Sequence, residues 1–150
     1  MKDKGGGSKM KLDRFTLGQV FETNTYRVTK EDVLRFAREF DPQYMHIDEE
    51  KAAAGRFNGI IASGIHTISI TFKLWVETGM YGDDVIAGTE MNHIKFMKPV
   101  YPDDELRAYA EVTRIEAKKE TEGILTVMLR TYNQTDTKVF ESELSALIKR

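Results

Sequence analysis

The chain has 150 residues, of which 41% are hydrophobic and 31% charged, enough for one domain with a buried core and a solvated surface. Its formal net charge is −2 and its basic residues are interleaved with acids, which argues against nucleic acid as a partner, because phosphate binding needs a concentrated basic face. The absence of cysteine excludes disulfides and thiolate chemistry and fits a reducing compartment.

The N-terminal stretch "MKDKGGGSKM" combines charge and glycine and lacks the apolar segment of a signal peptide. We interpret residues 1–9 as a tag and linker, with Met10 as the native start, and expect residues 10–150 to form a single domain. No apolar run approaches the about 20 residues of a membrane span. These features predict a cytoplasmic protein without a membrane partner.

The first predicted elements are a strand and a helix. Residues 18–28, "GQVFETNTYRV", alternate β-branched or aromatic residues with polar ones, which is typical of a strand. Thr29 is suited to cap a following helix, and Pro42 disfavours helical geometry at Asp41, so this helix should end there. Four residues at helical spacing are expected to form its buried face: Val33, Phe36, Ala37 and Phe40.

The next two segments are also predicted to be helical. A short helix should begin at Asp48 as N-cap and end near Gly55. Residues 58–79, "NGIIASGIHTISITFKLWVETG", fit both the alternation of a strand and the period of a helix. Their apolar zone is long for one strand and contains no turn signal, so its length favours a helix that is apolar nearly all round and therefore buried.

The remainder of the chain is predicted to be β-structure. Strands are expected at residues 90–100, 105–117, 124–133 and 139–150. The turn "YPDDEL", residues 101–106, contains an acidic pair that we attribute to solvation of the turn. The order of one strand, then helices, then hairpin-linked strands predicts an α+β fold, in which an antiparallel β-sheet packs on one long buried helix.

Asp41 and His46 form the first candidate site. A carboxylate and an imidazole are the minimal set for general acid–base catalysis, and this pair could hold one water, with His46 exchanging the proton and Asp41 tuning it. The structural alternative, which the spacing alone favours, is that Asp41 ends a helix and His46 packs in the turn between Met45 and Ile47.

Ser63 and Gly64 form the second candidate site, at the expected start of the long helix. Unpaired N–H groups at a helix N-terminus can bind a ligand oxygen, such as the oxyanion of a thioester enolate. The structural alternative is that Ser63 caps the helix and Gly64 permits close packing. A nucleophilic role for Ser63 is disfavoured, because the segment lacks the G-x-S-x-G pattern and a neighbouring base.

The histidines do not suggest a metal site. His46, His66 and His93 show no H-x-x-x-H spacing, the chain has no cysteine, and a metal needs convergent ligands. We therefore expect no bound metal, and we expect His66 and His93 to be packing or surface residues.

Two segments in this order, "FDPQYMHIDEEKAAAGRFNGIIASGIHT" and "MKPVYPDDELRAYAEV", resemble the MaoC-like dehydratase domain family, to which the (R)-specific enoyl-CoA hydratases belong. The resemblance extends from about Lys11 to Arg150. It implies a hot-dog fold, in which an antiparallel β-sheet wraps around a long central helix that starts near Ser63 and Gly64. It also implies dimerisation by sheet pairing, with sites near the subunit interface, so we expect a homodimer or a dimer of dimers.

The resemblance implies roles for the candidate residues. Asp41 and His46 would activate the water that adds across an enoyl double bond, and the Gly64 N–H, beside Ser63, would hold the thioester carbonyl. The chain departs from the hydratase pattern in two places. An Asn-Pro pair is missing between Asp41 and His46, where Gln43 is the candidate replacement for the amide, and Ser63 stands where a histidine is usual. These departures weaken the expectation of straight-chain crotonyl-type substrates.

The leading functional hypothesis is a hydro-lyase, an enoyl-thioester hydratase or 3-hydroxyacyl-thioester dehydratase acting on acyl-CoA substrates of fatty acid metabolism. Two alternatives remain open, because one fold can host several functions: a hot-dog acyl-CoA thioesterase, and a non-catalytic subunit that binds acyl thioesters. No cofactor is expected beyond the carrier of the substrate, which is coenzyme A or the phosphopantetheine of an acyl carrier protein.

Overall fold

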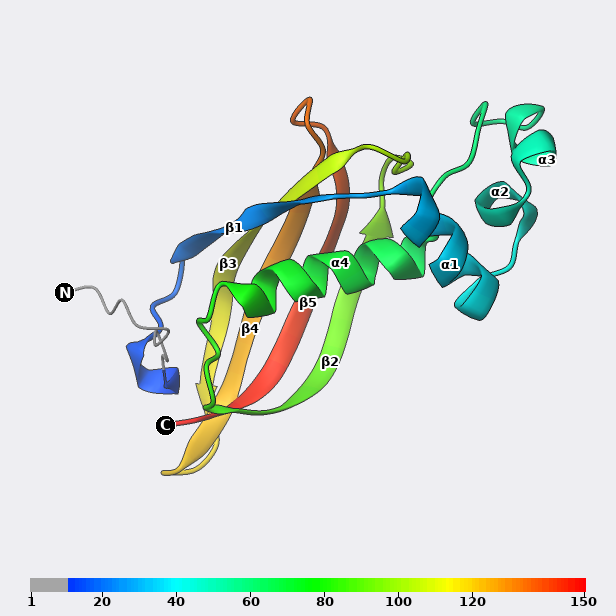
Figure 1. Ribbon diagram of the computed structural model, residues 1–150. Coiled ribbons are helices and arrows are strands. Elements are labelled where there is room, and N and C mark those ends of the chain that lie inside the picture. The colour runs from blue at the N-terminus through cyan, green and yellow to red at the C-terminus, as the bar shows by residue number, and fades with distance from the viewer. Residues whose placement is uncertain (1–10) are drawn as a thin grey trace.

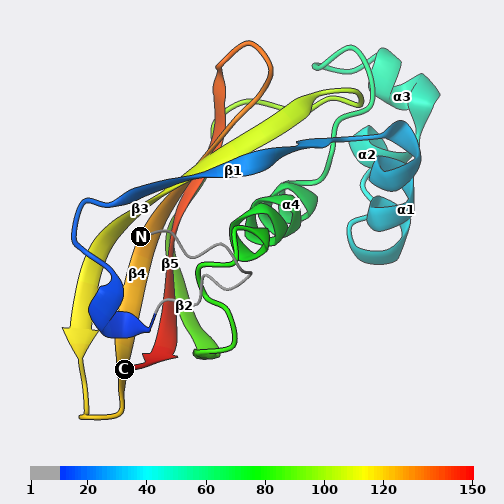
Figure 2. The ribbon, with the colours of Figure 1, turned by 60° about the vertical axis from the view of Figure 1, so that its left-hand side comes forward.

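A computed structural model, which describes residues 11–150, shows five antiparallel strands in one sheet that curves around a long helix (Figure 1 and Figure 2). The strands follow the order β1-β3-β4-β5-β2, so β1 and β2 form the two edges. Their bounds are β1 Val20–Arg27, β2 Val85–Phe96, β3 Glu105–Ala117, β4 Glu122–Tyr132 and β5 Lys138–Lys149. This is the expected α+β hot-dog architecture. The interpretation of residues 1–9 as tag and linker lies outside the described residues.

The strands agree closely with the alternation in the sequence. β3 has the predicted bounds, and its residues Leu106, Ala108 and Ala110 are buried because one face of the sheet packs on the core. β2 differs, since it starts at Val85 rather than at residue 90. Its first residues pair with the end of β5, where Val85 is opposite Ile148. A local sequence pattern cannot predict this long-range pairing, so the start of the strand was missed.

Two of the three short helices that precede the long helix were predicted from the sequence, and one was not. α1, Lys30–Phe40, begins after Thr29, whose hydroxyl accepts from the Asp32 N–H at 3.1 Å, and it ends before Asp41 as expected. α3, Glu49–Ala53, is capped by Asp48, whose carboxylate accepts from the Lys51 N–H at 3.0 Å. Between them lies the single-turn helix α2, Tyr44–Ile47, so His46 lies in a helix and not in the expected turn.

The expected burial of Phe40 is wrong. Val33 and Ala37 are buried and Phe36 is half-buried, but Phe40 is 68% exposed. Helices α1 to α3 lie beyond one end of the sheet, so the last turn of α1 has no strand to cover it (Figure 1). The Phe40 ring packs on Phe36, with ring centroids 5.2 Å apart, and its other side faces a cavity.

The segment with two possible patterns is a helix, α4, Gly64–Glu77, and it starts where the sequence predicted. α4 lies on the concave side of the sheet, and it packs against β1 and β3 (Figure 2). The expectation that it is buried all round is wrong within one chain: Ile65, Phe72 and Val76 are exposed and form a stripe. The sheet covers only one side of the helix, so this stripe has no partner among residues 11–150. No helix among residues 11–150 is long and apolar enough to cross a membrane.

Candidate active site

The candidate residues meet in one cavity at the N-terminal end of α4. The cavity has a volume of about 660 Å³. It lies between the start of α4, the segment that joins α1 to α2, the end of β2 and the start of β5. Asp41, Gln43, His46 and Gly64 all line it. The fold therefore brings together two candidate sites that lie apart in the sequence.

Both oxygens of the Asp41 carboxylate accept hydrogen bonds. The Ser63 hydroxyl donates to Oδ2 at 2.6 Å and the Gln43 amide donates to Oδ1 at 2.7 Å. Ser63 is fully buried, and its oxygen also accepts from the Ile65 N–H at 3.1 Å. One side chain therefore caps α4 and fixes the orientation of Asp41. Gln43, the candidate replacement for the missing Asn, donates its amide hydrogen to this carboxylate.

These hydrogen bonds also affect the charge of Asp41. Burial by itself raises the pKa of this carboxyl, but the hydrogen bonds from Ser63 and Gln43, together with the nearby His46, outweigh burial and hold the pKa below its ordinary value. Asp41 is therefore an ionised carboxylate at neutral pH, and it serves as an acceptor of hydrogen bonds.

The environment of His46 determines which ring nitrogen is free. His46 is only 5% exposed, and its Nδ1 lies 2.7 Å from the carbonyl oxygen of Ile61. A carbonyl oxygen can only accept, so Nδ1 carries the proton and Nε2 of the neutral ring is an acceptor. Nε2 lies 3.4 Å from Asp41 Oδ2. A water molecule that lies beside these two acceptors can donate one hydrogen bond to each of them.

The Gly64 N–H is the one first-turn donor of α4 that is not used within the described chain. The Ile65 N–H is bound by the Ser63 hydroxyl, and the N–H groups of His66 and Thr67 donate to the Ser63 carbonyl. Gly64 lines the cavity, so its N–H can donate to a bound ligand at the positive end of the helix dipole.

A side chain at residue 64 would collide with the cavity wall. A Cβ atom on Gly64 would lie 2.7 Å from Cε1 of Phe96, which is closer than real Cβ contacts. Glycine thus allows the Phe96 ring to lie over the start of α4. Sequence reasoning missed Phe96 and the other apolar residues of the wall, which reach the cavity from separate elements. They include Phe40, Phe57, Ile61, Ile65 and Val139.

His93 lies outside this cavity, and its ring bonds to Glu141 at 2.5 Å on the exposed strand β2. The sequence pattern did not point to Lys98, which is the one cation among the residues that line the cavity. The attribution of the acidic turn to solvation is wrong for Asp104. This side chain is buried and accepts hydrogen bonds from the Tyr101 N–H and the Gln134 amide.

Over residues 11–150, no group of three or more His, Asp and Glu residues is arranged to hold a metal ion.

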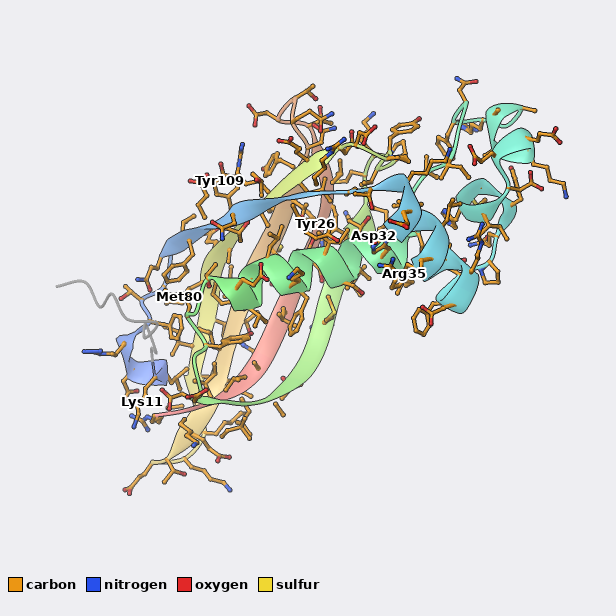
Figure 3. The ribbon with its side chains drawn as sticks, viewed as in Figure 1. Lys11, Tyr26, Asp32, Arg35, Met80 and Tyr109 are labelled. Carbon is orange, nitrogen blue, oxygen red and sulfur yellow. The ribbon has the colours of Figure 1, made fainter. Side chains whose placement is uncertain are left out.

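His66 is buried in α4 outside the cavity that holds Asp41 and His46. Its ring stacks on Phe36 with centroids 4.5 Å apart, and its Nδ1 has no hydrogen-bond partner among residues 11–150. Burial is the main cause that lowers the pKa of His66; Arg35 also lowers it, while Asp32 opposes the shift. Tyr26 donates to Asp32, which also binds Arg35, and these three side chains lie where β1 and α1 meet near α4 (Figure 3).

This lowered pKa predicts a loss of stability in mild acid. Below the ordinary histidine pKa of 6.5 the unfolded chain binds a proton at His66 before the folded chain does, so the free energy of unfolding falls as the pH decreases. His66→Phe keeps the aromatic stack and removes the titration. Denaturant unfolding from neutral to mildly acidic pH should show a smaller loss of stability for this variant than for the wild type, and equal losses would contradict the prediction.

The fold, a curved antiparallel sheet around one helix, is that of a hot-dog protein. Its cavity holds a carboxylate–imidazole pair and the Gly64 N–H, which together form a candidate acid–base site. The chain belongs to the MaoC-like family, because the family described as "MaoC like domain" matches residues 14–133. The resemblance seen in the sequence is thereby confirmed.

Two curated relatives and one solved structure show the range of similar proteins. An uncharacterized protein of Bacillus subtilis (strain 168), YdeM, is 67% identical over 94% of this chain and all of its own length. The 3-hydroxyacyl-thioester dehydratase Z of Mycobacterium tuberculosis is 30% identical over 65% of this chain and 66% of its own. The crystal structure of a MaoC-like dehydratase from Rhodospirillum rubrum is 33% identical, with a TM-score of 0.86, and the match covers 94% of this chain and 97% of that one.

Proposed function

We propose that the protein is a hydro-lyase that adds water to an enoyl thioester, or removes it from a 3-hydroxyacyl thioester. One observation carries the proposal: the two acceptor atoms His46 Nε2 and Asp41 Oδ2 lie 3.4 Å apart, in the same cavity as the Gly64 N–H, which has no acceptor among residues 11–150. The names of the M. tuberculosis dehydratase and the R. rubrum structure support the same class of reaction.

In the proposed mechanism, the thioester carbonyl accepts a hydrogen bond from the Gly64 N–H. When water attacks the β-carbon, negative charge develops on this carbonyl oxygen, where a fixed donor at the helix N-terminus stabilises it. The apolar wall, including Phe57 and Phe96, excludes bulk water and strengthens this interaction.

Asp41 and His46 handle the proton. The water donates one hydrogen bond to each residue, and His46 Nε2 takes the proton as the oxygen bonds to the β-carbon. Asp41 remains ionised and stabilises the imidazolium that forms. His46 then returns the proton to the α-carbon, so the enolate collapses to the 3-hydroxyacyl thioester and one water has been added. Dehydration runs through the same steps in reverse.

This mechanism needs no cofactor beyond the carrier of the acyl group, which we propose to be coenzyme A or acyl-carrier phosphopantetheine. Lys98 has no ion pair within residues 11–150, so its ammonium is free to contact a phosphate of the carrier at the edge of the cavity. We place the activity in the cytoplasm and in fatty acid metabolism, as expected from the sequence.

A panel of enoyl and 3-hydroxyacyl thioesters tests the proposal. Hydration removes the enoyl absorbance and leaves the thioester intact, whereas a thioesterase releases free thiol. We expect loss of enoyl absorbance without thiol release. Thiol release would favour the thioesterase alternative, and tight binding without turnover of any thioester would favour a non-catalytic binding subunit.

The exposed apolar residues lead to a prediction about assembly. The edge strand β2 exposes Ile86, Ile94 and Phe96, and it lies at the open edge of the sheet, where its outer N–H and C=O groups can pair with another strand. Pairing of two copies along β2, with their α4 stripes in contact, would cover these surfaces and give a two-fold dimer. We propose that the protein is a homodimer or a dimer of dimers.

Sedimentation at micromolar concentration should therefore give the mass of a dimer or tetramer. Ile94→Lys, which places a charge on the exposed edge strand, should shift the mass towards the monomer, while Lys95→Arg, at the next position, should not. A wild-type monomer would contradict the prediction.

A further inference from the structure

The loop that joins α3 to α4 runs from the helices beyond the end of the sheet to the start of α4 (Figure 1). It contains the pair Asn58-Gly59, in which an asparagine is followed directly by a residue without a side chain. The other asparagines of the chain, Asn24, Asn92 and Asn133, are each followed by a residue with a side chain. In this pair, therefore, a side-chain amide and the next backbone nitrogen can approach each other with the least steric hindrance.

The fold leaves both of these groups without partners. Asn58 is exposed, and neither its side-chain amide nor the Gly59 N–H makes a hydrogen bond among residues 11–150. A Cβ atom added to Gly59 would meet no atom within 4 Å, so the space around this peptide group is open. Asn58 has a φ of 57° and Gly59 a φ of 154°, which are conformations that asparagine and glycine respectively adopt with little strain.

On both sides of the pair the loop is held by hydrogen bonds. Before it, the Phe57 carbonyl accepts from the Tyr101 hydroxyl at 2.9 Å. After it, the Ile61 N–H donates to the Met45 carbonyl at 3.0 Å. The Ile61 carbonyl is also the acceptor that lies 2.7 Å from His46 Nδ1. The pair therefore lies in a short segment between two held positions, and the second of these positions orients His46.

We propose that Asn58-Gly59 is a site of spontaneous deamidation, and that its isoaspartyl product displaces the Ile61 carbonyl from His46. The displacement and the modification are independent of the reaction that the protein catalyses. Only the expected effect on turnover rests on the proposed function.

The reaction needs water and no other reactant. The Gly59 backbone nitrogen loses its proton to hydroxide and attacks Cγ of Asn58. A bond forms between these two atoms, the bond from Cγ to Nδ2 breaks, and Nδ2 takes up a proton and leaves as ammonia. Water then opens the resulting succinimide ring at either carbonyl. Opening at the main-chain carbonyl of residue 58 gives isoaspartate, in which the main chain runs through Cβ and Cγ and is one methylene longer.

The added methylene falls between the two held positions of the loop. Ile60 and Ile61 are buried, so the segment that follows the pair cannot move outwards without exposing apolar surface. We expect the longer main chain to be accommodated by loss of the hydrogen bonds of Ile61, which leaves the ring of His46 without its acceptor.

Incubation of the full chain at mildly alkaline pH tests the modification. Peptide mass spectrometry should show the amide of Asn58 replaced by a carboxyl group before any other asparagine changes. Asn133 is the internal control, because its Oδ1 already accepts from the Thr135 and Thr137 N–H groups. Asn58→Gly keeps a residue that tolerates the positive φ but cannot form the ring, so it should gain no negative charge on anion exchange.

A synthetic peptide of residues 54–62, incubated in parallel, gives the rate for an unrestrained chain. The folded protein should react at Asn58 within about tenfold of this rate, because a segment whose reacting groups carry no hydrogen bonds opens at little cost in free energy. Reaction slower than this, or faster at another asparagine, would overturn the proposal.

Hydrogen exchange tests the displacement without relying on activity. The deamidated fraction is separated by its added charge, and its isoaspartate content is measured by enzymatic methylation. The N–H groups of Ile61 and Ala62, which donate to the Met45 and Val100 carbonyls, should exchange at least about tenfold faster than in fresh protein. Fresh Asn58→Asp has the same charge and an unextended main chain, so it should exchange like the wild type. Equal exchange in the isoaspartyl and fresh proteins would overturn the displacement.

Turnover of an active enoyl thioester gives the last comparison. The isoaspartyl form should lose kcat by about 10–100-fold, the scale on which a small misplacement of a reacting group acts, while fresh Asn58→Asp and Asn58→Gly should stay within about twofold of the wild type. Full kcat in a fraction rich in isoaspartate would overturn the link to His46. A wild-type protein that hydrates no thioester would instead overturn the proposed function, and the mass and exchange measurements would still decide the modification and the displacement.

Discussion

Asp41→Asn and His46→Gln should each lower kcat by roughly 10²–10⁴, the usual scale for general acid–base catalysis. Asn keeps an oxygen to accept from Gln43, but its amide group would donate towards His46 Nε2 and occupy the atom that takes the proton. Gln at residue 46 can still bond to the Ile61 carbonyl but has no titratable nitrogen. Steady-state hydration kinetics on an active enoyl thioester measures both effects.

The two residues should behave as one unit. The double variant should be far less than multiplicatively slower than the single variants, because removing either group already abolishes the transfer. His93→Gln is a matched control, because His93 also faces a carboxylate, Glu141, but lies outside the cavity, so its kcat should be unchanged. If Asp41 and His46 only support the fold, each variant would retain full kcat per folded molecule and would differ from the wild type only in a lower melting temperature.

Gly64→Pro should lower kcat by a further factor of roughly 10²–10³ relative to Gly64→Ala, which is the usual cost of removing one oxyanion donor. Proline lacks the N–H that we propose for the thioester oxygen, and the first position of a helix tolerates it. Ser63 already has φ −60° and ψ 143°, which is the extended geometry that proline requires of the preceding residue.

Alanine is the necessary reference for this comparison. Both variants add a Cβ atom that meets the ring of Phe96, so both disturb the wall of the cavity to a similar degree. Only proline also removes the donor. Thermal melts should show that both chains fold. Equal kcat values for the two variants would show that the Gly64 N–H takes no part in the reaction.

The sequence by itself determined the elements that depend on neighbouring residues. Thr29 and Pro42 set the ends of α1 through a cap and a steric restriction, both of which act within a few residues. The alternation in β3 recorded which of its faces is buried, and the length of the apolar zone identified α4 as a helix. The spacing of Asp41 and His46 pointed to a candidate site, although it could not separate catalysis from packing.

Only the tertiary structure decided how the site is built. Ser63 reaches Asp41 across 22 positions of the chain, and the Ile61 carbonyl fixes the proton of His46 across 15. Phe40 has the spacing of a buried residue and is exposed, because the sheet ends before the last turn of α1. A periodic pattern predicts that one face of an element is apolar, but it does not predict which element covers that face, because this depends on the chain topology. For the same reason the sequence could not show that one side of α4 is left uncovered within a single chain.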